Sequence, residues 1–302
     1  MPFHLVGIDE AGYGPQLGPL VVSAAVLELP DNLLANQQVA CLWKTLSHIV
    51  ANNRSSAKVT VCDSKALYNP ARGLRELEKT ALVFRRMIEP GYCVHDELSL
   101  PLSADNNEIN KFSRILQSEL NHRSIRFCEA KVDIIEPADF NHGIRRLGNK
   151  ADFLWEVSAN LIKHCVDKYK YNNKVIIRAG KQGGRNYYLP HLQRLFPHRT
   201  VRPVEQGFNR SSYIIEDGPL PDAAISFIRD GDASEFVIAL ASIFSKYHRE
   251  LSMFKLNRFF RSHIQSLKPT SGYHSDSRRF IRKISPLFAK LNMDRNDFIR
   301  IK

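Results

Sequence analysis

The sequence predicts an α/β fold built on a mixed β-sheet and continued by a basic helical C-terminal extension. Two short β-rich runs open the chain, and helical periods then alternate with strand-like runs as far as residue 178. Of all residues, 43% are hydrophobic and 25% are charged, which is the composition of an ordinary globular protein. This composition excludes a disordered or collagen-like chain.

The first half of the chain supplies the strands and helices of this fold. The β-rich runs 3–9 and 20–29 predict an antiparallel hairpin, because the residues between them (EAGYGPQLGP) are typical of a turn. A third β-like run at 58–65 precedes a helix with an apolar stripe from Leu74 to Ile88. Apolar spacing then predicts a helix over 105–121, a strand over 125–135 and a helix over 151–168.

The second half is dominated by one long helix. A strand at 175–178 enters the Gly-rich segment 179–185, and a short helical piece and a strand at 199–204 follow. The most regular helix runs from about residue 234 to residue 262. Its polar face gathers Ser242, Ser245, Lys246, Arg249 and Glu250. A turn-rich stretch after residue 268 leads to a basic helical tail.

The charge of the chain is strongly basic and unevenly distributed. Lys and Arg number 43 against 31 Asp and Glu, which gives a net charge of +12. Residues 241–302 hold fourteen Lys and Arg against four Asp and Glu, and so carry +10 of this total. A surplus of this kind favours a polyanionic partner such as a nucleic acid.

Several protein classes are excluded by simple features of the sequence. The five cysteines form no C-x-x-C pair, which argues against a disulfide framework or zinc ribbon and favours a reducing cytoplasm. The longest nearly apolar run, 17–29, is too short and too interrupted to span a membrane. No Lys or Arg precedes the first apolar run, so the N-terminus does not resemble a signal peptide.

Asp9 and Glu10 form the first candidate site, at the end of a predicted strand. Adjacent carboxylates repel each other, so burying them together favours a bound divalent cation such as Mg²⁺. The alternative is a solvated acidic pair at the start of a turn. The glycines that follow, at 12, 14 and 18, do not have the G-x-G-x-x-G spacing of a dinucleotide-binding loop.

The segment from Gly180 to Gly184 is a second candidate. Lys181 and Arg185 could flank a phosphate bound by backbone N–H groups, although the Walker pattern is not matched and a simple turn explains the glycines equally well. The histidines form no H-E-x-x-H or H-x-x-x-H pair, which argues against a zinc enzyme. The absence of G-x-S-x-G argues against the commonest serine hydrolases.

Taken in order, five blocks of the sequence resemble type 2 ribonuclease H, also called ribonuclease HII, and its archaeal and eukaryotic branch in particular. The blocks are GIDEAGYGPQLGPLVV (7–22), DSK (63–65), VIIRAGKQGGRNYYLPHLQRLFP (175–197), ALASIFSKYHRE (239–250) and SGYHSD (271–276). The resemblance implies a ribonuclease H-like mixed sheet whose first three strands are antiparallel. It places a catalytic domain at 1–250 and a basic helical extension, packed on that domain, at 251–302.

The resemblance also implies a reaction. Members of the family hydrolyse the RNA strand of RNA–DNA hybrids, or cut beside a ribonucleotide embedded in DNA, with carboxylates that hold Mg²⁺ or Mn²⁺. Asp9 and Glu10 match the first two carboxylates, and Glu250 stands where the family usually has Asp. Gly180 occupies the position of a further catalytic Asp.

Three interpretations follow from Gly180. The chain is a nuclease with altered metal ligation, in which an acid from elsewhere such as Asp217 or Asp222 fills the gap; or it binds hybrids and cuts them poorly. A third interpretation is a phosphate-ligand enzyme that uses the loop 180–184.

Nucleic-acid contacts are expected around these positions. The candidates are Gly12, Tyr13, Gly14, Ser64, Lys65, Lys181, Arg185, Lys246 and Tyr273. For the lysines, an ordinary surface role is the alternative. Tyr13 replaces an arginine of the family motif and cannot make a bidentate phosphate contact, so we expect hybrids to bind at least as well as a lone ribonucleotide.

Overall fold

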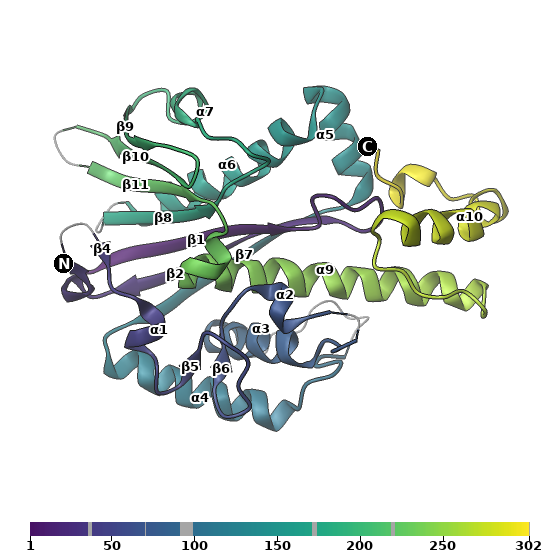
Figure 1. The fold of residues 1–302 in the computed structure, drawn as a ribbon, viewed down its shortest axis with the longest axis horizontal. Coiled ribbons are helices and arrows are strands. Elements are labelled where there is room, and N and C mark those ends of the chain that lie inside the picture. Colours follow the sequence, from purple (N-terminus) through teal and green to yellow (C-terminus); the bar gives the residue numbers. More distant parts are fainter. Residues whose placement is uncertain (36–37, 70, 91–98, 171–173, 219–220, 302) are drawn as a thin grey trace.

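The fold is a three-layer α/β arrangement in which one large sheet lies between two groups of helices (Figure 1). The computed structural model describes residues 1–35, 38–69, 71–90, 99–170, 174–218 and 221–301. The predicted α/β class with a mixed sheet is confirmed. Within these residues, no helix combines the length and the apolar character that crossing a membrane requires.

The central sheet has seven strands in the order β7-β2-β1-β8-β11-β10-β9. The strands are β1 (Phe3–Ala11), β2 (Leu20–Leu29), β7 (Arg126–Ile135), β8 (Lys174–Gly180), β9 (Thr200–Gln206), β10 (Arg210–Glu216) and β11 (Pro221–Ile228). The β1–β2 hairpin is antiparallel as predicted, and β7 continues it on the far side of β2. β1, β8 and β11 are parallel neighbours, so their carboxyl ends meet at one edge of the sheet.

Helices cover both faces of this sheet. On one face, α3 (Arg75–Ile88), α4 (Asn106–His122) and α9 (Phe236–His263) share a hydrophobic core with β1, β2 and β7. On the other face, α5 (Pro137–Leu147), α6 (Lys150–Tyr169) and α7 (Leu189–Leu195) pack on the sheet. The short helices α1 (Leu42–Thr45), α2 (Ser64–Leu67) and α8 (Gly231–Ser234) and the 3₁₀ turn η1 (Asp31–Leu33) lie in connections.

Four elements differ from the sequence-based expectation. The run at 58–65 does not join the central sheet: β6 (Val59–Thr60) pairs only with β5 (Val50–Ala51), and a second small sheet joins β3 (Leu34–Ala35) to β4 (Gln38–Val39). Residues 64 and 65 belong instead to α2, because the Asp63 carboxylate caps that helix by accepting from the Lys65 N–H. Strands β10 and β11 and helix α5 were not anticipated.

The C-terminal extension packs on the rest of the chain through a small core of its own. Its elements are α10 (His274–Lys290) and the 3₁₀ turn η2 (Arg295–Asp297). Leu17, from the turn after β1, is buried in this core beside Phe260 and Phe280. Helix α9 continues through residue 250, so the expected boundary between domain and extension falls inside a helix.

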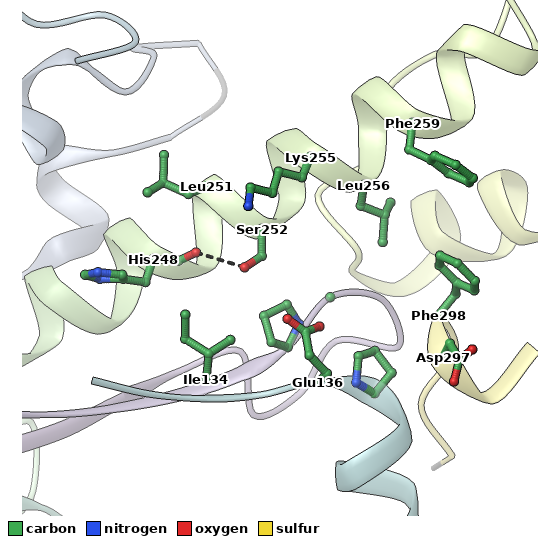
Figure 2. A pocket seen from close by; sticks show the side chains of 13 residues that line it. Ile134, Glu136, His248, Leu251, Ser252, Lys255, Leu256, Phe259, Asp297 and Phe298 are labelled. Atoms are coloured by element: carbon green, nitrogen blue, oxygen red, sulfur yellow. Dashed lines mark hydrogen bonds between the residues drawn. The ribbon is translucent and has the colours of Figure 1, made fainter. Parts of the chain in front are cut away.

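Aromatic side chains near the C-terminus pack against α9. The rings of Phe259 and Phe298 stack with centroids 6.3 Å apart. Figure 2 shows these two rings at one side of a cavity of about 300 Å³ between α9, the β7–α5 connection and the tail, with Glu136 and Lys255 on its walls. This cavity shares no lining residue with the carboxylate cavity described below.

Arg300 ties this tail to the turn that follows β1. Its guanidinium donates hydrogen bonds to the carbonyl oxygens of Gly12 and Tyr13, and its backbone N–H donates to the Gln16 carbonyl at 2.9 Å. The side chain is 1% exposed and lies over the Phe140 ring, with the guanidinium carbon 3.5 Å from the ring centroid. Burial lowers the pKa of Arg300 to about 9. The C-terminal residues therefore stabilise the turn 12–17 through these hydrogen bonds.

Gly7 allows the closest approach between the sheet and α9. A Cβ atom at Gly7 would lie 1.9 Å from the Val237 carbonyl oxygen, which is far inside van der Waals contact. Small residues on α9 continue this close packing, since the Ser245 hydroxyl donates to the Asp9 carbonyl at 2.9 Å. The position of α9 over β1 thus depends on the absence of a side chain at residue 7.

We predict that Gly7→Ala lowers the free energy of unfolding by about 3 kcal/mol, because the methyl group forces α9 away from β1. Urea denaturation measures this change. Gly14→Ala is the matched control, since an added methyl there would meet nothing within 4 Å; its effect should stay below about 1 kcal/mol. Equal effects of the two substitutions would contradict the close packing at Gly7.

We predict that Arg300→Met lowers the free energy of unfolding by about 2 to 4 kcal/mol, because the carbonyl groups of Gly12 and Tyr13 lose their donors. Arg295→Met, at an exposed position of the same tail, is the control and should change stability little. Thermal and urea unfolding of the two variants check this. A loss confined to Arg295→Met would show that the tail is held elsewhere.

Candidate functional site

The candidate site is a cavity of about 250 Å³ at the edge of the sheet where β1, β8 and β11 end. In α/β proteins, ligands bind at the carboxyl ends of parallel strands because the connecting loops open there. The lining residues that bear on chemistry are Asp9, Glu10, Gly12, Ser64, Lys65, Gly180, Lys181, Asp230, Asp232, Ser242, Lys246 and Tyr273. Nine of these twelve were candidates from the sequence; the others are Asp230, Asp232 and Ser242.

Asp9 and Glu10 lie at the end of β1, opposite Ser23 and Val22 of β2. Helix α9 crosses β1 at this point, and its Ser245 hydroxyl donates to the Asp9 backbone carbonyl. The Ser64 and Ser242 hydroxyls meet at 3.1 Å and join α2 to α9 at the cavity. The two carboxylates are therefore fixed by the same packing that fixes α9.

Asp232 is the acidic residue that the sequence reasoning missed. The register of β11 with β8 pairs Ile228 with Gly180, so the turn after β11 begins at the cavity. Asp230 adopts a left-handed conformation (φ 48°) that reverses the chain into α8, and Asp232 lies in the first turn of that helix. The D-G-D sequence between a strand and a long helix was the available signal.

Burial and neighbouring charges raise the pKa values of three of the carboxyl groups that line the cavity. Burial raises the pKa of Asp9 well above its usual value, and the charges of Glu10 and Asp232 raise it further. Burial raises the pKa of Glu10 to about 7, with a further increase from Asp232 and an opposing effect of Lys65. Burial and the charge of Asp63 also raise the pKa of Asp232. A cation bound among these side chains would relieve their repulsion.

Three lysines surround the carboxylates. Lys65 is exposed at the cavity wall and lowers the proton affinity of Glu10 and Asp232. The Lys246 ammonium lies 4.8 Å from the centroid of the Tyr68 ring and pairs with Glu250. The Lys181 ammonium donates to the Asn186 side chain and to the Gly207 carbonyl, so it ties two loops together beside the cavity.

The Asp9 carboxylate fills the place that a side chain at residue 180 would take. A Cβ atom at Gly180 would lie 2.6 Å from the Asp9 Oδ1 atom, which is closer than van der Waals contact allows. A side chain at this position would therefore point at the Asp9 carboxylate and displace it.

Glu250 lies outside the cavity, in contrast to the expectation from the sequence. Its Oε1 atom accepts hydrogen bonds from Lys246 Nζ at 2.6 Å and from Arg249 Nη1 at 2.9 Å. The Tyr68 hydroxyl also bonds to it, and this bond, with burial as the larger cause, raises the pKa of Tyr68. The reason is helical geometry, since Glu250 follows Lys246 by one turn of α9, or about 6 Å along the axis.

Asp217, one of the two acids suggested as substitutes for the missing Asp, does not reach the cavity. It pairs with Lys170 and Arg199, each at 3.6 Å, beyond the end of β10. The other, Asp222, is near the start of β11, and its side chain lies outside the described part of the structure.

Tyr13, Gly14 and Arg185, also candidates from the sequence, do not line the cavity. Arg185 pairs with Asp152 at 2.8 Å and lies over the rings of Trp155 and Tyr188. Tyr13 stays close to it, because the charges of Glu10 and Arg185 both affect its pKa, which burial raises.

The loop 180–184 does not offer a row of backbone donors. The N–H groups of Lys181, Gln182 and Arg185 donate to Ile228, Tyr188 and Gln182 respectively. A phosphate cradle needs such N–H groups to be directed at the ligand. The interpretation as a phosphate-ligand enzyme therefore gains no support from this loop.

The donor set of the cavity is typical of hard cations. Carboxylate oxygens are the ligands that Mg²⁺ and Mn²⁺ prefer, and the mutual repulsion of Asp9, Glu10 and Asp232 fits a cation between them. Within the described residues, no three His, Cys, Asp or Glu side chains already converge closely enough to hold an ion. The four cysteines that the structure describes are free thiols.

Comparison with known proteins gives one curated relative. Ribonuclease HII of the archaeon Pyrobaculum islandicum is 25% identical over 150 residues, a match that covers 50% of this chain and 60% of that protein. The chain thus spans less than two thirds of the relative that it matches. No family model matches the chain.

Two solved structures with similarity over nearly the whole chain are named ribonuclease HII and ribonuclease H2. The PCNA complex of ribonuclease HII from Archaeoglobus fulgidus has 16% identity and a TM-score of 0.45, covering 99% of this chain and 95% of that one. Ribonuclease H2 from Pyrococcus horikoshii has 16% identity and a TM-score of 0.49, covering 98% and 92%. The resemblance to type 2 ribonuclease H, and to its archaeal branch, is confirmed by the curated relative.

Proposed function

We propose that this protein is a metal-dependent endoribonuclease that hydrolyses the RNA strand of RNA–DNA hybrids. The observation that carries the proposal is a single cavity lined by Asp9, Glu10 and Asp232 and by three lysines. Carboxylates for a cation and ammonium groups for phosphates are the two requirements of metal-assisted phosphodiester hydrolysis. The resemblance to ribonuclease HII supports the same reaction.

Asp9, Glu10 and Asp232 would hold Mg²⁺ or Mn²⁺, and Glu250 would not. The cation, when bound, supplies charge stabilisation to a phosphodiester and lowers the pKa of a water molecule. Glu250 is instead neutralised by Lys246 and Arg249. In this assignment the fourth ligand position of the resemblance passes from α9 to the first turn of α8.

The lysines and Tyr273 would bind the nucleic acid around the scissile phosphate. Lys65 of α2 and Lys246 of α9 both line the cavity and can each contribute positive charge beside a phosphate. Tyr273 is 39% exposed, and the Arg249 guanidinium lies 5.1 Å from its ring centroid. A ring held in this way presents a flat surface to a sugar or base.

Hybrids are the proposed substrate, in preference to DNA with one embedded ribonucleotide. Tyr13 stands in the turn 12–14, where a single hydroxyl replaces the guanidinium expected from the resemblance. The backbone of this turn can still approach the 2′-hydroxyl of RNA, because Gly12 and Gly14 remain. Contacts distributed along a hybrid are then needed for affinity.

Gly180 favours a second candidate function, a hybrid-binding protein that cleaves slowly. Residue 180 supplies no carboxylate beside Asp9, so a second metal ion would lack that protein ligand. Binding through the lysines does not need that ligand. Both candidate functions predict binding of hybrids, but the nuclease would cleave them much faster than the binding protein.

We predict that Asp9→Asn and Asp232→Asn each lower Mg²⁺-dependent cleavage of a labelled hybrid by about 100-fold or more, because each removes a proposed metal ligand. Glu250→Gln is the matched control and should lower the rate less than about tenfold, since its carboxylate lies outside the cavity. Gel-based cleavage rates in Mg²⁺ and in Mn²⁺ give the comparison. The assignment of Asp232 is wrong if Glu250→Gln abolishes cleavage and Asp232→Asn leaves it intact.

We predict that Gly180→Asp raises the hybrid cleavage rate at least tenfold, because the new carboxylate would point at Asp9 and share its cation. Gly180→Asn has the same size without the charge and should give no increase. Single-turnover rates with both variants distinguish a ligand from a filled space. An unchanged rate in Gly180→Asp would count against both the alignment and the interpretation of Gly180 as a missing ligand.

A further inference from the structure

A groove of about 920 Å³ runs along α9 on the side that faces α2 and the stretch 269–276. Its walls include Tyr68 and Leu74 on one side and Thr270 and Ser271 on the other, with the α9 side chains along its floor. In Figure 1, α9 continues beyond the sheet between α10 and the α2–α3 region. The groove lies against this continuation.

The groove begins where the carboxylate cavity ends. Lys246 lines the cavity, Glu250 lines the groove, and their side chains are 2.6 Å apart. On the other wall, Tyr273 lines the cavity and Ser271 lines the groove, and the Arg249 guanidinium reaches both. A chain that leaves the cavity in this direction therefore enters the groove directly.

The residues that line the groove carry no net formal charge, since Arg258 and Arg261 balance Glu250 and Asp276, but the cations that neutralise the two carboxylates lie just outside this lining. Its carboxylates are already engaged: Glu250 by Lys246 and Arg249, and Asp276 by Arg279 and the backbone N–H of Ser271. Arg258 and Arg261 are exposed on the α9 wall. In the part of the chain that the structure describes, neither guanidinium forms an ion pair with a carboxylate.

The spacing along α9 sets the length of strand that could be contacted. Lys246 and Arg261 are fifteen residues apart, or about 22 Å along the helix axis. A strand of nucleic acid advances about 3.4 Å per nucleotide, so this distance corresponds to about six nucleotides. Arg258 and Arg261, about 18 and 22 Å from Lys246 along the helix, would then meet phosphates about five to seven nucleotides from the cavity.

We propose that this groove binds the phosphate backbone of a nucleic-acid duplex, with Arg258 and Arg261 as its phosphate-binding residues. The proposal rests on the proposed function, since it extends the path of the strand that enters the carboxylate cavity. It assigns part of the excess positive charge after residue 241 to a defined surface. Arginines that contact phosphates contribute affinity without base specificity, so sequence preference should not depend on them.

The test is hybrid binding by Arg258→Ala/Arg261→Ala, measured by fluorescence anisotropy with a hybrid of about 16 base pairs without Mg²⁺ over a range of salt concentrations. We expect the affinity at low salt to fall at least tenfold and the slope of log K against log salt to fall in magnitude by about 1.8, the value for two phosphate contacts. Lys111→Ala/Arg114→Ala removes two exposed cations from α4, away from the groove, and should leave both quantities unchanged. Melting temperatures of both double variants verify that the fold is intact.

The possible results test the groove proposal and the proposed nuclease activity separately. Unchanged affinity and salt slope in Arg258→Ala/Arg261→Ala overturn the groove, whereas cleavage of the same hybrid by the wild-type protein in a parallel assay with Mg²⁺ leaves the proposed function standing. Hybrid binding that depends on the two arginines without any cleavage supports the groove and rejects the nuclease. An equal loss of affinity for polyglutamate would show a general anion-binding surface and overturn the assignment to duplex phosphates.

Discussion

The close contact between β1 and α9 organises both the fold and the candidate site. β1 is the central strand from which the antiparallel hairpin and the parallel strands extend, and α9 can lie on it only because Gly7 has no side chain. The same crossing brings the Ser245 hydroxyl to the Asp9 carbonyl and sets Lys246 at the cavity. The close packing of α9 on β1 thus both stabilises the core and places the charged groups at the cavity.

Charge in this molecule is separated over short distances. Negative groups concentrate at the carboxyl ends of the parallel strands, where burial and mutual repulsion raise the pKa values of Asp9, Glu10 and Asp232. Positive groups follow α9 away from this point. The arrangement costs stability in the free protein and is relieved by ligands of both signs, namely a cation for the carboxylates and phosphates for the arginines. A metal ion and a nucleic acid would therefore favour each other's binding.

The sequence predicted elements whose pattern is local and missed those that depend on tertiary structure. The β1–β2 hairpin follows from two β-rich runs on either side of a turn rich in Gly and Pro, and α9 follows from the helical spacing of its apolar residues. Strand β10 was missed because Ser211 occupies a buried position in its alternation. For the site, Asp9 and Glu10 followed from their place at a strand end, but Asp232 depends on the β8–β11 register, which no local pattern reveals. Glu250 fits the sequence motif, but in the folded chain it lies one turn of α9 beyond Lys246 and does not line the cavity.

The hydrogen bonds from Arg300 join residues that are 288 and 287 positions apart in the chain. Contacts between residues this distant form late in folding, because the loop between them must be closed before they contribute energy. The turn after β1 therefore reaches its final conformation only when the C-terminal tail has docked, although it follows the first strand. A partly folded chain with a complete sheet would still lack the native conformation of the turn after β1. Because this turn is proposed to contact the nucleic acid, binding would begin only after the tail has docked.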